Sequence, residues 1–245
     1  MEAGSVRPDA SGVRSLEVTA MIVVWRVLTS CNLSCPFCAF DGRLAFERSH
    51  ADPAEILRVT GLLADYQAQS GDPVLLSWLG GEPFLWRPLR DLTLGARALG
   101  LEVSATTNGT TLGSPRVREH VRDAYKELTI SVDGFSAMHN PMRGWVGGFE
   151  KLRSWIPALA SEARAQRSGL KLRANVVLMR QNVAEFPALC SELATWGIAE
   201  ITFNQLGGRD RPEFHPSHRL RPADVDALEA QLPDIESAWT VWARS

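Results

Sequence analysis

Three cysteines, Cys31, Cys35 and Cys38, lie close together in the segment CNLSCPFC. This C-x3-C-x2-C spacing puts three thiolates on one loop, where they can bind one face of a metal centre. Structural zinc takes four protein ligands, and the next candidate along the chain, His50, is 12 residues further on. A [4Fe–4S] cluster has four irons, so three cysteines would leave one iron open to a substrate or cofactor. The spacing favours the cluster, and a zinc or redox-active thiol loop that borrows a ligand from elsewhere in the fold is the alternative.

Five clusters of polar or glycine residues each follow a strand-like run. They are CNLSCPFC (31–38), GGEP (80–83), TNG (107–109), SVDG (131–134) and NQLGG (204–208). The carboxyl ends of parallel strands meet at one rim of an α/β fold, and binding sites gather there. Random scatter would not put five such clusters after successive strands, so we expect them to form one site.

Short runs rich in branched and aromatic residues alternate with longer segments of helical apolar spacing. The predicted strands are 20–28, 73–79, 101–107, 127–133, 170–179 and 199–206. The predicted helices begin at Asp52-Pro53, Pro88, Ser114-Pro115, Phe149 (with an irregularity at Pro157), Asn182 and Pro222.

Six β-then-α units in series predict a parallel sheet with helices outside it. Six units close less readily than eight, so the predicted fold class is α/β, a partial (β/α)6 TIM-like barrel. The barrel is expected over residues 19–206. A flexible leader (1–18) should precede it, and a C-terminal loop and helix (207–245), which could bridge to an absent domain, should follow.

The composition is that of an ordinary folded protein, with 45% of the 245 residues hydrophobic, 22% charged and a net charge of −2. Without a basic excess, neither nucleic acid nor an anionic membrane is expected as the main partner. The polar N-terminus lacks the apolar core of a secretion signal, and the apolar run 20–25 is too short to cross a bilayer. Four cysteines are too few for a disulfide scaffold, and Cys190 is expected to be a buried small hydrophobe. We therefore predict a cytoplasmic protein.

The cysteine motif after the first strand and GGEP after the second resemble the two hallmarks of the radical SAM enzymes, over roughly residues 22–206. The resemblance implies that Cys31, Cys35 and Cys38 bind a [4Fe–4S] cluster whose fourth iron is chelated by the amino and carboxylate groups of S-adenosylmethionine (SAM). An electron from a reduced flavodoxin- or ferredoxin-type donor would cleave SAM to methionine and a 5′-deoxyadenosyl radical, which takes a hydrogen atom from the substrate. The protein orients the cofactor and excludes competing reactions.

The resemblance also assigns the GGEP turn to the amino group of SAM. Two glycines let the backbone approach a ligand closely, and a carboxylate with exposed carbonyls suits a cation. The residues of this turn are Gly80, Gly81, Glu82 and Pro83. Thr107, in the TNG segment, is expected to face SAM as well.

Phe37 and Leu206 occupy positions that lie against adenine in similar proteins. Ser131 and Arg143, in a stretch that resembles SxDG…HxxxRG of the SPASM-associated branch, are expected to hold the SAM carboxylate, for which an arginine fork is well suited. Asp133 is expected to cap a turn or contact the ribose.

Relatives in that branch carry a Cys-rich domain after the barrel, whereas this chain has no cysteine after Cys190, so we expect a truncated or degenerate relative. The predicted substrate is a peptide or a small natural product. The alternatives are a sugar-type dehydrogenase, epimerase or decarboxylase and, from another class, a non-catalytic metal-binding scaffold. His139 is expected to be a structural loop residue, and His215 and His218 to lie in a solvated loop.

Overall fold

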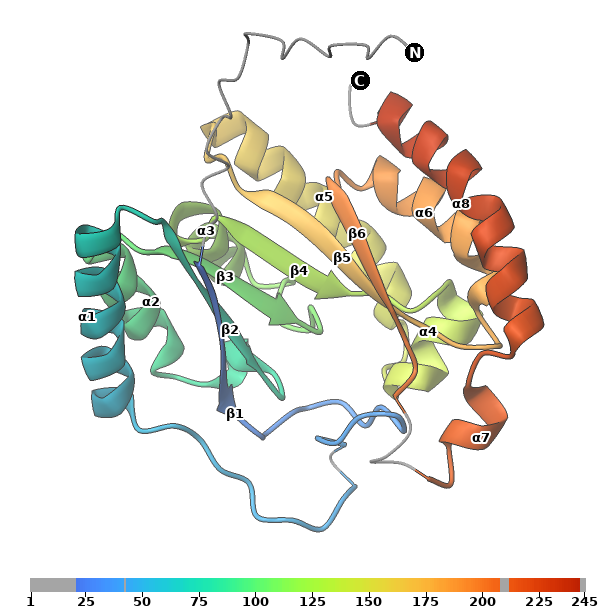
Figure 1. The fold of residues 1–245 in the computed structure, drawn as a ribbon, viewed down its shortest axis with the longest axis horizontal. Coiled ribbons are helices and arrows are strands. Elements are labelled where there is room, and N and C mark those ends of the chain that lie inside the picture. Colours follow the sequence, from blue (N-terminus) through green and yellow to red (C-terminus); the bar gives the residue numbers. More distant parts are fainter. Residues whose placement is uncertain (1–20, 42, 208–211, 243–245) are drawn as a thin grey trace, which may run out of the picture.

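The computed structural model describes residues 21–41, 43–207 and 212–242, so the predicted leader lies outside the described residues. Six strands form one parallel sheet in the order of the sequence (Figure 1). Every predicted strand is present, with boundaries shifted by one or two residues. The strands are β1 (Met21–Leu28), β2 (Val74–Gly80), β3 (Glu102–Thr107), β4 (Glu127–Ser131), β5 (Lys171–Leu178) and β6 (Glu200–Gln205).

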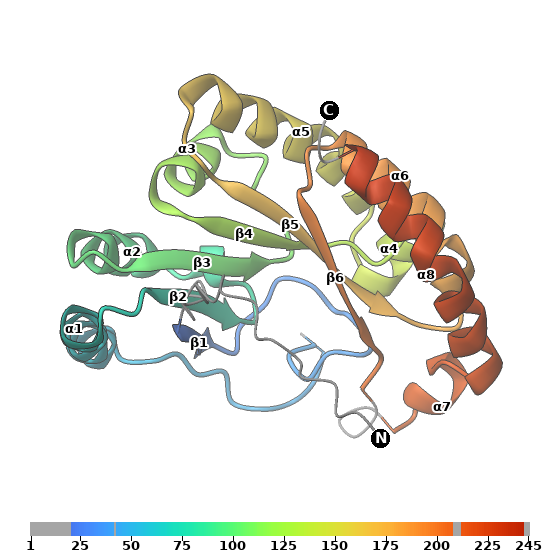
Figure 2. The same cartoon turned by 45° about the horizontal axis from the view of Figure 1, so that its top comes forward.

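Helices connect successive strands, as expected for parallel pairing. They are α1 (Pro53–Ser70), α2 (Leu89–Ala98), α3 (Pro115–Ala124), α4 (Ser136–Arg143), α5 (Gly148–Gln166), α6 (Phe186–Thr195), α7 (His215–His218) and α8 (Pro222–Trp242), with two 3-10 turns, η1 (Pro83–Leu85) and η2 (Val183–Glu185). In the tilted view of Figure 2, α6 and α8 lie together beside β6 at one end of the sheet.

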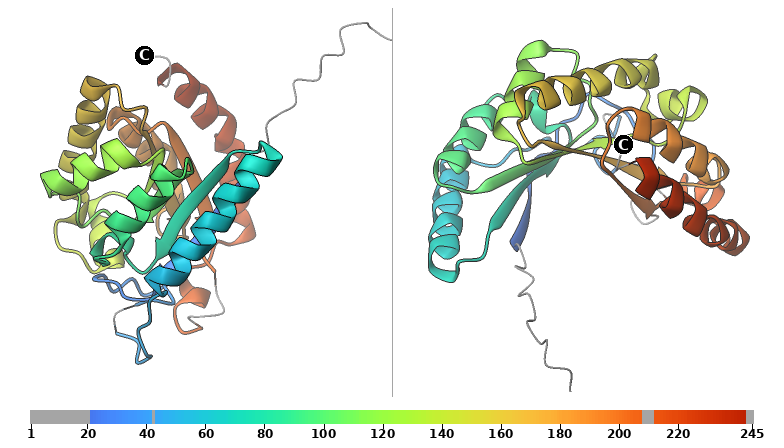
Figure 3. Two further views of the ribbon diagram at one scale, coloured as in Figure 1. Left: turned by 90° about the vertical axis from the view of Figure 1, so that its left-hand side faces the viewer. Right: turned by 90° about the horizontal axis from the view of Figure 1, so that it is seen from above.

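The sheet is curved and unclosed, with β1 at one edge and β6 at the other (Figure 3). The main helices lie on its convex face, and the hydrophobic core fills the space between. Along β5 burial alternates strictly: Leu172 and Ala174 are buried against the helices, whereas Arg173 and Asn175 point to the concave face. The observed fold is the predicted partial barrel of α/β class.

The concave face has an apolar side and a polar side. On β1, Ile22 and Val24 are about 60% exposed. Towards the other edge, Arg173 on β5 pairs with Glu127 on β4 and Glu200 on β6. The helices of the described ranges leave this face uncovered (Figure 3).

Local signals explain most helix ends. The Asp52 carboxylate accepts a hydrogen bond from the Ala54 amide at 2.9 Å, as expected of an N-cap, and Gly71 ends α1 in the left-handed conformation. Helix α5 runs through Pro157, as the predicted helical stretch does. The expectation for Asn182 was wrong, because its side chain does not cap a helix. Helix α4 was not predicted.

After β6 the chain forms α7 and then α8, which packs against α6. His215 and His218 both lie in α7 and are half-buried, and His218 stacks on Phe214, so the expectation of a solvated loop was wrong for both. Cys190 is buried in α6, as predicted. In the described part of the chain, no helix is both long enough and apolar enough to cross a membrane.

Candidate active site

The cysteine loop leaves the carboxyl end of β1 and turns tightly on itself. The amide of Cys38 donates to the carbonyl of Cys35 at 3.0 Å, and all three thiols are free. Burial raises the pKa of Cys31, and it raises that of Cys35 to about 11, with Cys38 acting in the same direction on both. The thiols are therefore close enough to repel one another as thiolates. A metal centre would offset that repulsion, because its positive charge stabilises the thiolates that bind it.

One arginine fixes the segment that follows the motif. The guanidinium of Arg48 donates to the carbonyls of Thr29, Phe40 and Asp41 at 2.8–3.1 Å. Arg48 thereby satisfies these three backbone acceptors of an irregular loop. It also links the residue after β1, Thr29, to the end of the cysteine loop at Phe40 and Asp41. No pattern in the sequence indicates this role.

The GGEP turn packs directly against the cysteine loop. The Gly81 amide donates to the Leu28 carbonyl and the Glu82 amide to the Ser30 carbonyl, both at 2.9 Å. A Cβ at Gly81 would overlap the Ser30 carbonyl group. The two chain segments thus meet backbone to backbone, which accounts for the need for glycine here without any ligand.

Glu82 is fully buried and points into the protein. Its carboxylate accepts from the Thr107 hydroxyl and the Asn108 amide, each at 2.7 Å, and from the Phe84 amide at 3.2 Å. Burial raises its pKa to about 7, against the effect of these donors. The side chains of Glu82 and Thr107 hold each other and the TNG turn, which leaves the backbone of the GGEP turn for the expected contact with SAM.

Asn108 joins this turn to the cysteine loop. Its amide group lies 3.6 Å from the Cys31 sulfur and donates to the Asn32 side chain at 3.0 Å. An N–H directed at a thiolate sulfur stabilises the charged form and tunes an iron–sulfur site. The sequence pattern indicates the TNG segment but assigns this role to no residue in it.

Arg143 lies on the other side of the loop, at the end of α4. Its Nε is 2.6 Å from the Asp133 carboxylate, both side chains are buried, and its Nη1 is 3.9 Å from the Cys35 sulfur. Burial alone would lower the pKa of Arg143, but Asp133 and Cys35 raise it, so the guanidinium stays charged. The backbone also contributes, because the Ser34 amide donates to the Arg143 carbonyl at 3.4 Å.

Asp133 is fully buried, so both of its oxygens face protein. One oxygen pairs with Arg143 and the other accepts from the Val177 amide at 3.0 Å. Asn182 supports the same turn, because its side-chain amide donates to the Asp133 carbonyl at 2.6 Å and to the Val177 carbonyl at 2.9 Å. Neither turn-capping nor an accessible ribose ligand describes Asp133; it orients Arg143. The supporting role of Asn182 was missed because one acceptor, the Asp133 carbonyl, lies 49 residues earlier in the chain.

His139 also belongs to this network, through a hydrogen bond with the backbone of Asp133. Its Nδ1 accepts from the Asp133 amide at 3.2 Å, and burial lowers its pKa to about 4. A neutral, fully buried imidazole agrees with the structural role expected of His139, but the residue lies in α4 and not in a loop. Ser131, at the end of β4, is buried, and its hydroxyl has no hydrogen-bond partner among the described residues.

Phe37 and Leu206 come together in a small apolar cluster separate from the main core. Met138, Met179 and Leu206 are its buried members, and Phe37 and Phe214 pack partly buried against them. The Arg143 guanidinium also lies over the Phe37 ring, 5.4 Å from its centroid. Two residues that are 169 positions apart, and that were both expected against adenine, therefore share one surface.

The donor set fits an iron–sulfur cluster. Three free thiols lie on one loop, and in a cubane each would bind a different iron. Within the described ranges, no three His, Cys, Asp or Glu side chains stand in position around a single metal ion. The residues that would hold the cluster are Cys31, Cys35 and Cys38.

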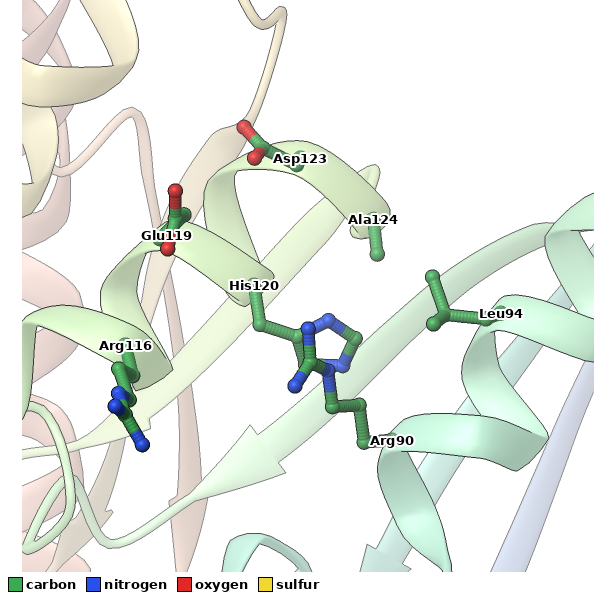
Figure 4. Close-up of a pocket in the computed structure, with 7 residues that line it drawn as sticks. All are labelled: Arg90, Leu94, Arg116, Glu119, His120, Asp123 and Ala124. Carbon is green, nitrogen blue, oxygen red and sulfur yellow. The ribbon is translucent and has the colours of Figure 1, made fainter.

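Cavities also occur on the convex side, behind the sheet. One of about 410 Å³ lies between α2 and α3, where the guanidinium of Arg90 stands beside the His120 ring (Figure 4). Burial and the Arg90 charge lower the pKa of His120. The other residues that line this cavity are Leu94, Arg116, Glu119, Asp123 and Ala124. None of these was predicted to belong to the site, and none is on a strand end of the rim.

The family model of the radical SAM superfamily matches residues 25–193, which is most of the chain. The chain belongs to the radical SAM superfamily. This radical SAM enzyme accordingly has SAM and a [4Fe–4S] cluster as its cofactors, and the matched range covers the cysteine loop, the GGEP turn and Arg143.

Relatives of this radical SAM enzyme have diverse names. It is 28% identical over 192 residues to Fe-coproporphyrin III synthase of Methanosarcina barkeri, covering 76% of this chain and 44% of that protein. It is 28% identical over 221 residues to PqqA peptide cyclase of Xanthomonas euvesicatoria, covering 88% and 56%. Pre-heme d1 synthase of Dinoroseobacter shibae is 28% identical, covering 89% and 52%. The chain thus spans about half the length of these relatives.

Among solved structures, Streptococcus suis SuiB bound to S-adenosylmethionine superposes with a TM-score of 0.67 at 18% identity, covering 89% of this chain and 48% of that one. SuiB bound to its precursor peptide SuiA gives 0.66 at 20% identity, covering 89% and 46%. These likenesses establish the shared fold.

Proposed function

We propose that this radical SAM enzyme modifies a peptide, with Cys31, Cys35 and Cys38 as cluster ligands and a reduced flavodoxin- or ferredoxin-type protein as electron donor. The single observation that carries the site assignment is the meeting of three segments at the cysteine loop: the GGEP turn, the TNG turn and Arg143. When bound, the cluster and SAM supply a 5′-deoxyadenosyl radical that can take a hydrogen atom from the substrate.

The protein's own groups prepare this chemistry by position and charge. Arg143 uses its Nε for Asp133 and directs Nη1 towards the cysteine loop, where the carboxylate of SAM is expected. A guanidinium held by a buried carboxylate cannot swing away, and it binds a second carboxylate through its terminal nitrogens. The free hydroxyl of Ser131 is the second group proposed for that carboxylate. The apolar surface of Phe37 and Leu206 is proposed to exclude water from the adenine.

The concave face of the sheet supports a peptide as substrate. The Asn175 side-chain oxygen accepts from Thr202 at 3.3 Å and from Asn204 at 2.9 Å. In that arrangement the amide N–H2 of Asn175 and the side-chain oxygen of Asn204 have no partner within the described part of the chain. A free donor group beside a free acceptor complements a backbone amide, which carries one donor and one acceptor.

A tetrapyrrole is the second candidate, because two of the relatives are named for haem-type products. Such substrates carry carboxylates and need free cations. Beside Asn175, Lys171 and Arg173 are already paired with Glu127 and Glu200, which favours a neutral amide-bearing substrate there. The exposed cation of β1, Arg26, lies with its guanidinium over the Phe40 ring at the opposite edge of the sheet. A sugar substrate and a non-catalytic metal-binding scaffold are tested by the same experiments.

The test begins with anaerobic reconstitution. The protein should hold about four irons per chain, since one three-cysteine site is present, and Cys35→Ala should lose them. Reduced protein should form 5′-deoxyadenosine from SAM. One tightly bound zinc and no deoxyadenosine would support the scaffold instead.

Incubation with candidate substrates separates the enzyme classes. A peptide substrate should increase deoxyadenosine formation and change in mass. Stimulation by a tetrapyrrole or a sugar and not by peptides would contradict the peptide assignment while leaving the radical chemistry intact.

A further inference from the structure

The chain returns to the rim after its last strand. Residues 212–221, which contain α7, lie beside the carboxyl end of β6 (Figures 1 and 2) and place Phe214 against the apolar cluster. The Phe214 and Phe37 rings are 6.4 Å apart between centroids and tilted by 48°. This segment lies beyond residues 25–193, the range matched by the family.

Arg180, just after β5, holds the segment in place. Its amide donates to the His218 carbonyl at 2.9 Å, and its guanidinium donates to the carbonyls of Ser217 and Arg219 at 3.3 and 3.2 Å. Gln181 donates to the Ser217 carbonyl as well, at 3.3 Å. These bonds join two loops that are nearly 40 residues apart, at a point where no strand pairing connects them.

The ring of Phe214 is also fixed from within the segment. The His218 ring stacks on it with centroids 3.6 Å apart and planes within 10°. The Nδ1 of His218 lies 2.8 Å from the Phe214 carbonyl. With one face of Phe214 covered by His218, the remainder of the ring lies towards the cluster that contains Phe37 and Leu206, yet Phe214 stays only half-buried.

We propose that Phe214 forms an aromatic wall for the adenine of SAM, and that Arg180 is the positioning residue that holds it there. The inference rests on the proposed function, because it takes the Phe37 and Leu206 surface as the adenine side of the site. An aromatic face binds a purine base by stacking. The thioethers of Met138 and Met179 in the same cluster are polarisable and make favourable contacts with aromatic rings.

The experiment measures binding without turnover. Reconstituted, unreduced protein is dialysed to equilibrium against labelled SAM and, separately, against labelled methionine, which has the amino and carboxylate groups but no adenine. Phe214→Ala should weaken SAM binding about tenfold, the effect of losing one aromatic–base contact, and leave methionine binding unchanged. Phe214→Tyr keeps the ring and should restore affinity.

Arg180→Gln should weaken SAM binding less, about threefold, and again spare methionine. In the double variant the losses should not add, because Arg180 acts through Phe214. The matched control is Phe203→Ala, which removes a ring on β6 that packs against Phe186 instead; it should change neither ligand. Iron content and thermal midpoint are measured for each protein, and Phe214→Leu, which keeps apolar volume, replaces the alanine variant if that one loses its iron.

Unchanged or tighter SAM binding in Phe214→Ala would overturn the inference, since the ring would then be a bystander or would occupy the adenine position itself. Equal losses for SAM and methionine would also overturn it, by showing a general disturbance. If the unaltered protein holds its iron and binds no SAM, the proposed function has failed rather than this inference.

Discussion

Gly81→Ala tests whether the cysteine loop needs its close contact with the GGEP turn to keep its position and bind iron. The added methyl group would overlap the carbonyl of Ser30 and stand 3.0 Å from the amide nitrogen of Cys31. Both neighbours are backbone atoms, so no side chain can rotate away. The loop that carries the cysteines must move instead.

The expected cost has two parts. Forcing a methyl group into a packed site typically costs about 1–3 kcal/mol. Separating the two segments also breaks the bonds from Gly81 to Leu28 and from Glu82 to Ser30, each worth about 1 kcal/mol. Together the free energy of unfolding should fall by roughly 3–5 kcal/mol. Iron content should fall with it, because the displaced backbone includes Cys31.

Urea unfolding followed by circular dichroism measures the first effect, and iron analysis after anaerobic reconstitution measures the second. Gly61→Ala is the matched control, because a Cβ there meets nothing within 4 Å and α1 gains a better helix former. It should raise stability by about 0.5–1 kcal/mol. A Gly81→Ala protein that keeps its iron and loses less than about 1 kcal/mol would refute this account of the turn.

Three further changes probe the buried charges. Asp133→Asn leaves Arg143 buried without its partner and should lower the free energy of unfolding by about 3–5 kcal/mol, whereas Asp123→Asn at an exposed ion pair should have no measurable effect in the same urea titration. Arg143→Lys keeps the charge but not the fork, so SAM affinity in equilibrium dialysis should fall by roughly 1.5–3 kcal/mol, and an unchanged affinity would exclude Arg143 from the carboxylate site. The pKa of Glu82 is raised in the folded protein, so between about pH 4.5 and 7 the folded protein keeps a proton that the unfolded protein has lost. The contribution of Glu82 to stability is therefore complete below pH 4.5 and is lost as the pH rises towards 7. Glu82→Gln should flatten that part of the stability profile, worth about 3 kcal/mol, and an identical slope in both proteins would show that Glu82 is already ionised in this range.

The fold and the location of the site could be predicted from the sequence because both depend on local patterns. Strand periodicity identified the six strands, and the cysteine loop and the GGEP turn each follow a strand directly, so parallel pairing was enough to bring them to one rim. Arg143 reaches the same rim through α4, which the periodicity did not indicate. The roles of the three cysteines and of Arg143 stay predictions.

The direction of a side chain depends on distant partners and could not be predicted. Glu82 was expected to face a ligand, but the amide of Asn108 and the hydroxyl of Thr107 turn it inward. Asn182 is of a residue type that often caps helices, yet its side-chain amide donates to the carbonyls of Asp133 and Val177. A motif names the residues that meet, and only the packed chain shows which of them still has a free group.

The strictly sequential strand order has a consequence for biosynthesis. Each βα unit can dock on the one made before it, so the barrel can assemble from its N-terminus as the chain leaves the ribosome. The cysteine loop is made first, but Asn108 and Arg143, which contact it, emerge 77 and 108 residues after the cysteines they face. The thiols therefore lack their contacts with Asn108 and Arg143 until more than half of the chain has been translated. During synthesis, therefore, this loop carries thiols that the residues contacting them do not yet cover.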